Sequence, residues 1–226
     1  MGREYKVASK KCRSLKEVFR GLMEGNLKLE KWQMVGILML VVVFAGCFGW
    51  LYEFVFYFFN GGMKEFYMQG GNFLPWINIY AIGSLLILVA CWKLRRWPWA
   101  VFLVSIVVTG VLEFVAGWLV YTIGNGTRYW DYNTEIWNYG NIEGFVCLRS
   151  VLIFGVSALF LMYVVVPFFT WLSFKMARRT FMILAVTLFT VIMIDEVYNL
   201  LASKVFGWPD AMEFWRSAGW KYVGDS

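Results

Sequence analysis

The sequence contains no histidine in its 226 residues. This absence excludes histidine general bases, catalytic triads that use histidine, and zinc or haem sites with histidine ligands. The chain also lacks the GxxxxGK[ST] motif of P-loop nucleotide hydrolases, the GxSxG motif of serine hydrolases and the HExxH motif of zinc proteases. No pattern of carboxylates specifies a divalent cation. We therefore expect no cofactor, no metal site and no ATP hydrolysis by this chain, and we lean against an enzyme.

Cysteine and charge are also scarce. The four cysteines have no CxxC spacing, and three of them lie in or beside apolar runs, which favours small buried hydrophobes: Cys12, Cys47, Cys91 and Cys147. Charged residues make up only 16% of the chain, yet the net charge is +6. The basic residues cluster at the ends of apolar runs. This placement indicates membrane lipids with anionic headgroups, rather than nucleic acid, as the electrostatic partner.

Apolar residues are abundant, because 60% of the chain is hydrophobic and the mean hydropathy is +0.60. A membrane span needs about 20 apolar residues. Five runs meet this need, and they predict spans at residues 34–59, 74–92, 99–123, 145–172 and 181–202. The predicted fold is an all-α bundle of five transmembrane helices.

No break in composition divides the apolar block, which predicts one transmembrane domain at residues 32–206. A basic segment at 1–31 precedes it, and an aromatic tail at 207–226 follows it. The basic segment is either a short amphipathic helix on the membrane surface or a solvated tail.

The distribution of lysine and arginine predicts the orientation. With the N-terminus inside, the inner segments hold fifteen basic residues and the outer segments hold five. Cytoplasmic loops carry an excess of such residues. We therefore predict a multi-pass protein of the cell membrane with its N-terminus inside and its C-terminus outside.

Charged residues interrupt the apolar runs, although each costs roughly 2.5–3.5 kcal/mol on insertion scales. The set comprises one arginine and four carboxylates, with an asparagine nearby: Glu53, Glu113, Arg149, Asp195, Glu196 and Asn199. Their depths place them together in the outer half of the membrane. Glycines share the helical faces of the first two glutamates, which favours a position facing the bundle centre.

Two interpretations of this charged layer stay open. It is either a buried ion-pair network that locks helices together, or an outward-facing polar pocket for a substrate; a third, weaker interpretation has the acids reach lipid headgroups. Four carboxylates face one arginine, which slightly favours the pocket. The sequence does not decide which acid pairs with Arg149.

The stretch at residues 109–132 organises this layer, because it joins the span of Glu113 to an aromatic loop. The loop carries Trp130, Asp131 and Tyr132. Its aromatic residues are typical of a belt at the membrane interface. Asp131 is interpreted either as the cap of a re-entrant turn or as a residue that closes the mouth of the pocket.

Several short motifs in order resemble the ABC-transporter type IV permeases of the CmpB type. They are GWLYE at 49–53, IYAIG at 79–83, the span acid and glycine at 113 and 117, WDY at 130–132, NYGNI at 138–142 and VP at 166–167. The resemblance covers residues 42–169. The family has Pro where this chain has Asn78, and often Ser where it has Asn133, and the fifth span lies outside the resemblance.

The resemblance implies a permease-like protein, and three hypotheses follow. The first is the membrane subunit of a transporter, with the polar pocket as its substrate site. Lacking a nucleotide site, it would need a separate ATPase, an ion gradient or no energy source. If an ATP-binding subunit couples, it would dock on the inner loops at residues 93–96 and 175–179. The second is an intramembrane enzyme acting on a lipid-linked substrate, and the third is a membrane scaffold or assembly factor. A homo-oligomer is compatible with each.

Overall fold

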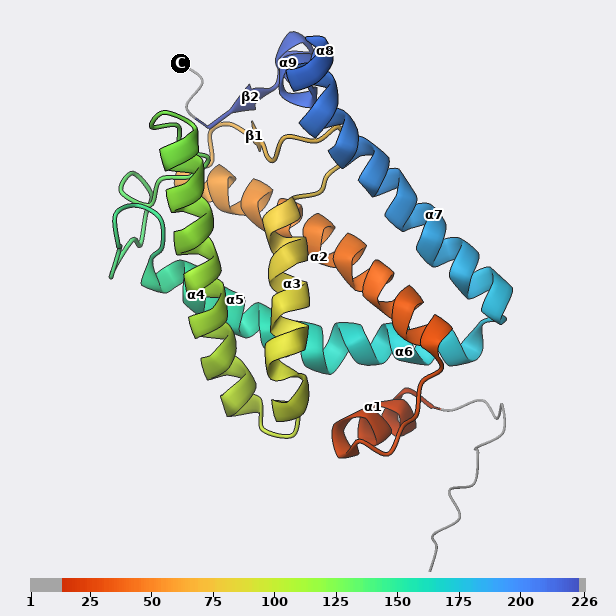
Figure 1. Cartoon of the computed structure of the whole chain (residues 1–226). Coiled ribbons are helices and arrows are strands. Elements are labelled where there is room, and N and C mark those ends of the chain that lie inside the picture. Colours follow the sequence, from red (N-terminus) through yellow and green to blue (C-terminus); the bar gives the residue numbers. More distant parts are fainter. Residues whose placement is uncertain (1–13, 224–226) are drawn as a thin grey trace, which may run out of the picture.

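The computed structural model describes residues 14–223, apart from the side chains of residues 202–204. Cys12, the first thirteen residues of the predicted basic segment and the last three of the predicted tail lie outside the described residues. The rest of the chain is helical with one two-stranded sheet (Figure 1). Its elements are α1 (Leu15–Glu24), α2 (Lys31–Asn60), β1 (Tyr67–Met68), α3 (Asn78–Cys91), η1 (Trp92–Leu94), α4 (Pro98–Ile123), α5 (Leu148–Phe160), η2 (Leu161–Val165), α6 (Val166–Lys175), α7 (Arg178–Val197), η3 (Tyr198–Ala202), α8 (Ser203–Phe206), α9 (Ala211–Ser217) and β2 (Lys221–Tyr222).

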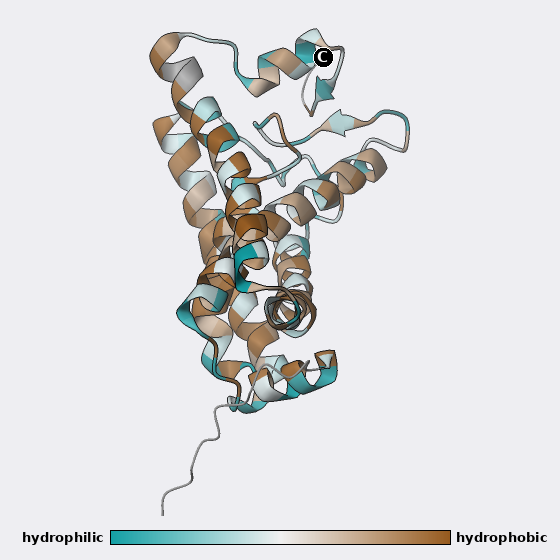
Figure 2. Ribbon diagram, turned by 90° about the vertical axis from the view of Figure 1, so that its right-hand side faces the viewer, coloured by the Kyte–Doolittle hydropathy of each residue, from teal (hydrophilic) through white to brown (hydrophobic). Residues whose placement is uncertain are grey.

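The all-α membrane bundle is confirmed, with one qualification on the number of spans. Four helices are long and apolar enough to cross a membrane, and they cover Lys31–Asn60, Pro98–Ile123, Leu148–Lys175 and Arg178–Leu201. The fifth, Asn78–Leu94, is shorter. At about 1.5 Å of rise per residue it is several ångströms short of the roughly 30 Å hydrocarbon core of a bilayer. Figure 2 shows the apolar helices in the middle of the molecule.

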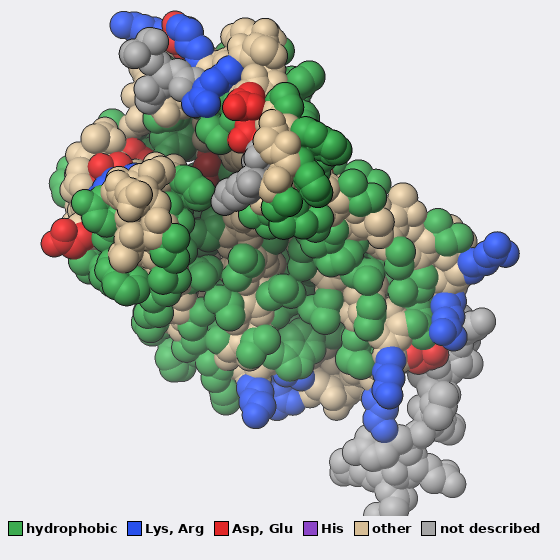
Figure 3. Space-filling view, turned by 45° about the horizontal axis from the view of Figure 1, so that its top comes forward, with side chains coloured by type: hydrophobic (Ala, Val, Ile, Leu, Met, Phe, Trp, Pro, Cys, Tyr) green, Lys and Arg blue, Asp and Glu red, His purple; other side chains and the backbone are tan. Residues whose placement is uncertain are grey.

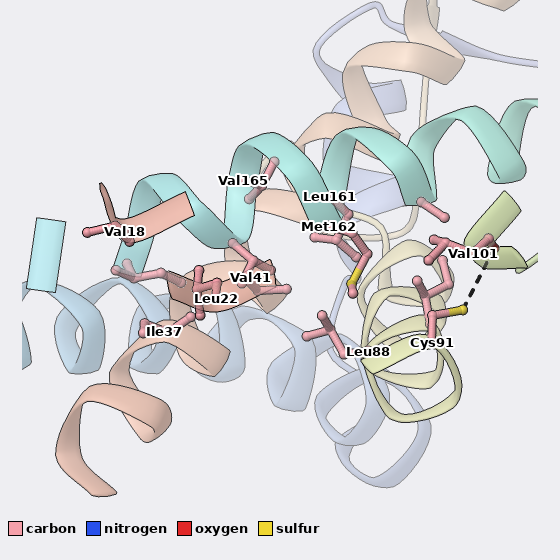
Figure 4. Close-up of a cluster of buried hydrophobic side chains, with 14 of the residues drawn as sticks. Val18, Leu22, Ile37, Val41, Leu88, Cys91, Val101, Leu161, Met162 and Val165 are labelled. Atoms are coloured by element: carbon pink, nitrogen blue, oxygen red, sulfur yellow. Dashed lines mark hydrogen bonds between the residues drawn. The ribbon is translucent and has the colours of Figure 1, made fainter. Parts of the chain in front are cut away.

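Helix α2 lies at the centre of the bundle and packs against α3, α6 and α7, while α4 packs against α3 and α5. The buried core is made mainly of aliphatic and sulfur-containing side chains, with Phe181, and they come from α1 to α7 and η2; Figure 4 labels several of them. Val41 and Val101 have no exposed surface at all. Helix α1 and the C-terminal segment lie at opposite ends of the molecule (Figures 1 and 2), which we call the α1 end and the loop end.

The α1 end is held together by the basic loop between η1 and α4. Val18 and Leu22 of α1 are buried against the core. Arg95 donates a hydrogen bond of 2.7 Å to the carbonyl of Leu22, and Arg96 donates to the carbonyls of Met23 and Glu24. Two cations therefore cap the C-terminus of α1, where the helix dipole favours positive charge.

The chain before α3 is not helical, although the sequence predicted a span from residue 74. Trp76 is 3% exposed, and its indole N–H donates to the carbonyl of Val42 at 3.3 Å. The backbone N–H of Ile77 donates to the carbonyl of Gly46 at 3.1 Å. Irregular backbone at membrane depth is tolerated where protein groups satisfy it. This segment is therefore buried against α2, and α3 begins only at Asn78.

At the loop end, β1 pairs in parallel with β2, so that Tyr67 lies opposite Lys221 and Met68 opposite Tyr222. Lys221 also forms an ion pair with Glu65 at 3.0 Å. The described part of the predicted tail therefore contacts the loop that follows α2.

Candidate functional site

The six predicted pocket residues fall into two groups in the structure. Glu53, Glu113 and Arg149 belong to one group, between α2, α3, α4 and α5. The second group comprises Asp195, Glu196 and Asn199. It lies beside the segment that precedes α3.

Glu53 is half-buried on α2 and accepts a hydrogen bond of 3.0 Å from the hydroxyl of Tyr80 on α3. Two glycines on the same face of α2 permit this contact. A Cβ at Gly49 would lie 2.1 Å from the Tyr80 ring, and a Cβ at Gly46 would lie 2.1 Å from the Trp76 indole. Glycine at 49 therefore permits the close approach of α3, and glycine at 46 permits that of the segment before it.

Glu113 of α4 is 4% exposed, and both of its oxygens have partners. The hydroxyl of Tyr132 donates to one oxygen at 2.5 Å, and that of Ser150 on α5 donates to the other at 2.7 Å. Burial and the nearby charge of Glu113 raise the pKa of the Tyr132 hydroxyl well above its ordinary value. Tyr132 is therefore a stable hydrogen-bond donor that ties the loop to the bundle.

Arg149 lies at the first turn of α5 and pairs with Glu135, an acid of the 124–147 loop. The N–O distance is 2.5 Å, and the Arg149 side chain is 10% exposed. Tyr57 of α2 donates to the other oxygen of Glu135 at 2.7 Å. The partner of Arg149 is thus none of the four acids considered from the sequence.

Sequence reasoning missed Glu135 and Tyr57. Glu135 stands in a polar loop and Tyr57 in an aromatic run, and neither position differs in pattern from its neighbours. The one available signal was the presence of a buried arginine, which requires a carboxylate partner nearby.

These side chains form one polar layer, which we call the glutamate layer: Glu53, Tyr57, Tyr80, Glu113, Tyr132, Glu135, Arg149 and Ser150. Its three carboxylates lie close enough to interact electrostatically. One arginine faces them. The layer therefore holds an excess of acidic groups, and the second oxygen of Glu53 accepts no hydrogen bond from any described residue.

A narrow apolar recess begins beside this layer. It is lined on α2 by Phe44, Phe48 and Tyr52, and on α3 by Tyr80 and Ser84, with a third wall from α5 and η2. Its volume is about 50 Å³. Tyr80 belongs to both features, because its ring lines the recess and its hydroxyl binds the layer.

The second group anchors the irregular segment before α3. Asp195 accepts hydrogen bonds from the backbone N–H groups of Phe73 at 3.1 Å and Leu74 at 2.7 Å. Asn199, one turn later on the same face, donates to Asp195 at 2.8 Å and accepts from the backbone of Ala211 at 2.8 Å. These contacts join α7, the segment before α3 and the start of α9.

Glu196 completes this group from the adjacent position. It accepts from the side-chain amides of Asn72 at 2.9 Å and Asn78 at 3.0 Å. Its negative charge lies at the N-terminus of α3, where the helix dipole favours an anion. Among the described residues, no hydrogen bond or ion pair joins the second group to the glutamate layer.

The predicted mouth residues shape the 124–147 loop. Asp131 accepts from the backbone and side chain of Asn133 at 3.0 and 2.7 Å and lies 3.7 Å from Arg128. The Trp130 indole donates to the carbonyl of Phe145 at 2.9 Å. Gly144, with a φ of +76°, is enclosed so tightly that a Cβ would lie 2.4 Å from Asp131. The contacts of Asp131 stay within the loop.

Figure 3 shows a hollow on the face turned toward the viewer, near the loop end, with acidic side chains around and within it. Lysine and arginine side chains lie along the lower and right edges of the same view and also at its top. Among the residues that the structure describes, no three His, Cys, Asp or Glu side chains are grouped to hold a metal ion.

The chain was compared with known protein families. The model of a family described as putative ABC-transporter type IV matches residues 40–200. The chain belongs to this family. Neither the curated proteins nor the solved structures gave a significant match.

Membership of the ABC-transporter type IV family confirms the resemblance read from the sequence. The match reaches residue 200, and therefore includes α7, which the resemblance had left outside. The family and the four apolar helices together make the chain a multi-pass, transporter-related membrane protein.

Proposed function

We propose that the protein is the membrane subunit of a transporter, and that the glutamate layer contacts the transported molecule. The observation that carries this proposal is the unsatisfied carboxylate of Glu53. Its second oxygen accepts no hydrogen bond from a described residue, and it lies in a layer where three acids face one arginine. Charged groups inside spans are expensive and mark substrate pathways when they are not fully paired.

The two groups of polar residues have different roles in this proposal. Glu113 has a hydroxyl on each oxygen, which suits a structural contact between the loop and the bundle. Asp195, Glu196 and Asn199 anchor the segment before α3. Glu53 is left as the acid best placed to receive a group from outside the protein.

Energy for transport would come from a separate ATP-binding subunit, because this sequence has no P-loop motif. We propose that this subunit docks at the α1 end, on the inner side, with the C-terminus outside. Arg95 and Arg96 cap α1 and are occupied in that role. The docking charges are therefore assigned to exposed residues of the same end, Lys93 and Arg179.

The test is purification of the tagged full chain in a mild detergent, followed by mass spectrometry of the proteins that accompany it. The proposal predicts a stoichiometric ATP-binding protein. Purification of the chain alone, or with lipid only, would contradict the ATP-driven version.

A further inference from the structure

The apolar recess and the glutamate layer meet at Tyr80, whose ring lines the recess and whose hydroxyl donates to Glu53. Phe44, Phe48 and Tyr52 follow each other at intervals of four residues along one face of α2. The recess therefore extends about 12 Å along the helix, from α2's middle toward the layer. Its head lies at Tyr52 and Tyr80, and Tyr80 touches Glu53.

The shape of the recess limits what can occupy it. The enclosed part is narrow, and aromatic rings line most of its length. Phe160 of α5 closes it from the third side, with its ring centroid 5.7 Å from that of Phe48. Phe48 and Phe160 are each 38% exposed, so the recess is open on its side toward the surrounding lipid. A narrow apolar slot of this kind suits a single alkyl chain better than a bulky ring system.

The wall at the head of the recess includes Tyr52, and Glu53 lies next to this wall without lining the recess. The Tyr52 hydroxyl has no hydrogen bond to any described residue, and neither has the second oxygen of Glu53. The Tyr52 hydroxyl lies within electrostatic range of Glu53, the next residue along α2.

From this geometry we infer that the site binds an amphiphile with one alkyl chain in the recess and a primary ammonium group at Glu53. The carboxylate supplies the opposite charge and a hydrogen-bond acceptor. The Tyr52 hydroxyl accepts or donates a second hydrogen bond at the head group. This inference deepens the proposed function, since it names the chemical class of the transported molecule for the same site.

Two sources supply this chemistry, a lipid such as phosphatidylethanolamine and a free long-chain amine. The experiment compares them on the full chain in nanodiscs of phosphatidylcholine, whose head group has no ammonium hydrogen. Dodecylamine, dodecanol, dodecanoate or phosphatidylethanolamine is titrated in, and native mass spectrometry counts the molecules retained per chain.

We expect one dodecylamine or one phosphatidylethanolamine to be retained, and dodecanol and dodecanoate to bind at least about tenfold more weakly. Glu53→Gln should weaken retention of the amine by a similar factor, and Tyr52→Phe should weaken it less. Glu143→Gln makes the same chemical change at an exposed loop acid and should retain it as the unchanged chain does. Displacement of dodecylamine by phosphatidylethanolamine would identify the lipid as the source.

Equal retention of dodecylamine and dodecanoate would overturn the inference, as would undiminished retention by a folded Glu53→Gln variant. Because Glu53→Gln could misfold, Tyr52→Phe provides an independent test: its retention should fall while its Tm is unchanged. Each of these results would refute the amine ligand without refuting the proposed transport function. A chain that copurifies with an ATP-binding protein but retains no amine refutes only the substrate class.

Discussion

At the scale of single residues, the acids inside the spans have different hydrogen-bond partners, although in the sequence each is an acid within an apolar run. Glu113 is enclosed by two hydroxyl donors, Asp195 binds backbone N–H groups, and Glu53 has one donor from Tyr80. A buried carboxylate whose donors are all protein groups stabilises the fold. One with a vacant oxygen can receive a ligand.

Glu113→Gln tests the structural role of Glu113. The amide can accept at one position only, so one of the hydroxyls of Tyr132 and Ser150 would face an N–H donor. We expect the free energy of unfolding to fall by about 1–3 kcal/mol. The measurement is the Tm in detergent, with Glu143→Gln as the exposed control. An unchanged Tm would contradict the assignment.

Asp195 and Glu196 allow a finer comparison, because their donors differ. Asp195 receives two backbone N–H groups, which cannot change their chemistry. Glu196 receives two side-chain amides, and an asparagine amide can turn over to present its oxygen. Asp195→Asn should therefore release the segment before α3, whereas Glu196→Gln should have little effect.

Hydrogen exchange measures this difference. Peptides that contain Phe73 and Leu74 should exchange faster in Asp195→Asn than in Glu196→Gln. Equal exchange in both variants, or no change in either, would show that Asp195 does not anchor the segment.

At the scale of elements, close packing of α2 and α3 positions the site. Gly49 brings the two helices together, so that Tyr80 reaches Glu53 and also forms a wall of the recess. The first half of the predicted second span is not helical, and its buried tryptophan occupies the space beside Gly46. A helix over the whole predicted range would lose this contact.

Gly49→Ala tests this packing directly. Its methyl group would lie 2.1 Å from the Tyr80 ring, so α3 must move away from α2. Such overpacking costs about 1–3 kcal/mol. We expect a lower Tm together with weaker retention of dodecylamine.

Gly71→Ala is the matched control, because its added methyl group meets nothing within 4 Å. Its Tm and amine retention should equal those of the unchanged chain. Equal Tm and equal amine retention in Gly49→Ala and Gly71→Ala would show that α2 and α3 do not pack closely at Gly49.

At the scale of the whole molecule, the sequence predicted the fold class and most span boundaries, because long apolar runs determine which segments can cross a membrane. Four of the five predicted spans correspond to long apolar helices. The early start of the second span was wrong. Apolar composition marked residues 74–77 as membrane-embedded, but it could not show that α2 and α7 satisfy their backbone.

The sequence placed Glu53, Glu113 and Arg149 in one layer, and the structure brings them together. The position of a residue in its span gives its depth in the membrane, which explains this agreement. It does not show where the residue lies within the plane of the membrane, so the separate location of Asp195 and Glu196 was missed. Glu135 was missed because a loop residue has no depth that the sequence can assign.

The orientation and the docking of an ATP-binding subunit remain predictions at this scale. The charge bias puts the α1 end inside, and Lys93 and Arg179 are exposed there. Reversal of both charges should weaken docking while leaving the core and the cap of α1 intact. Lys64→Glu reverses an exposed charge at the loop end and serves as the control.

The most direct measurement is the ratio of ATP-binding protein to tagged chain after mild-detergent purification, compared for three forms. The account predicts a stoichiometric ratio for the unchanged chain and for Lys64→Glu, and a ratio reduced at least severalfold for Lys93→Glu combined with Arg179→Glu. Absence of any ATP-binding protein from the unchanged chain would contradict the central claim that this protein is a membrane subunit of an ATP-driven transporter.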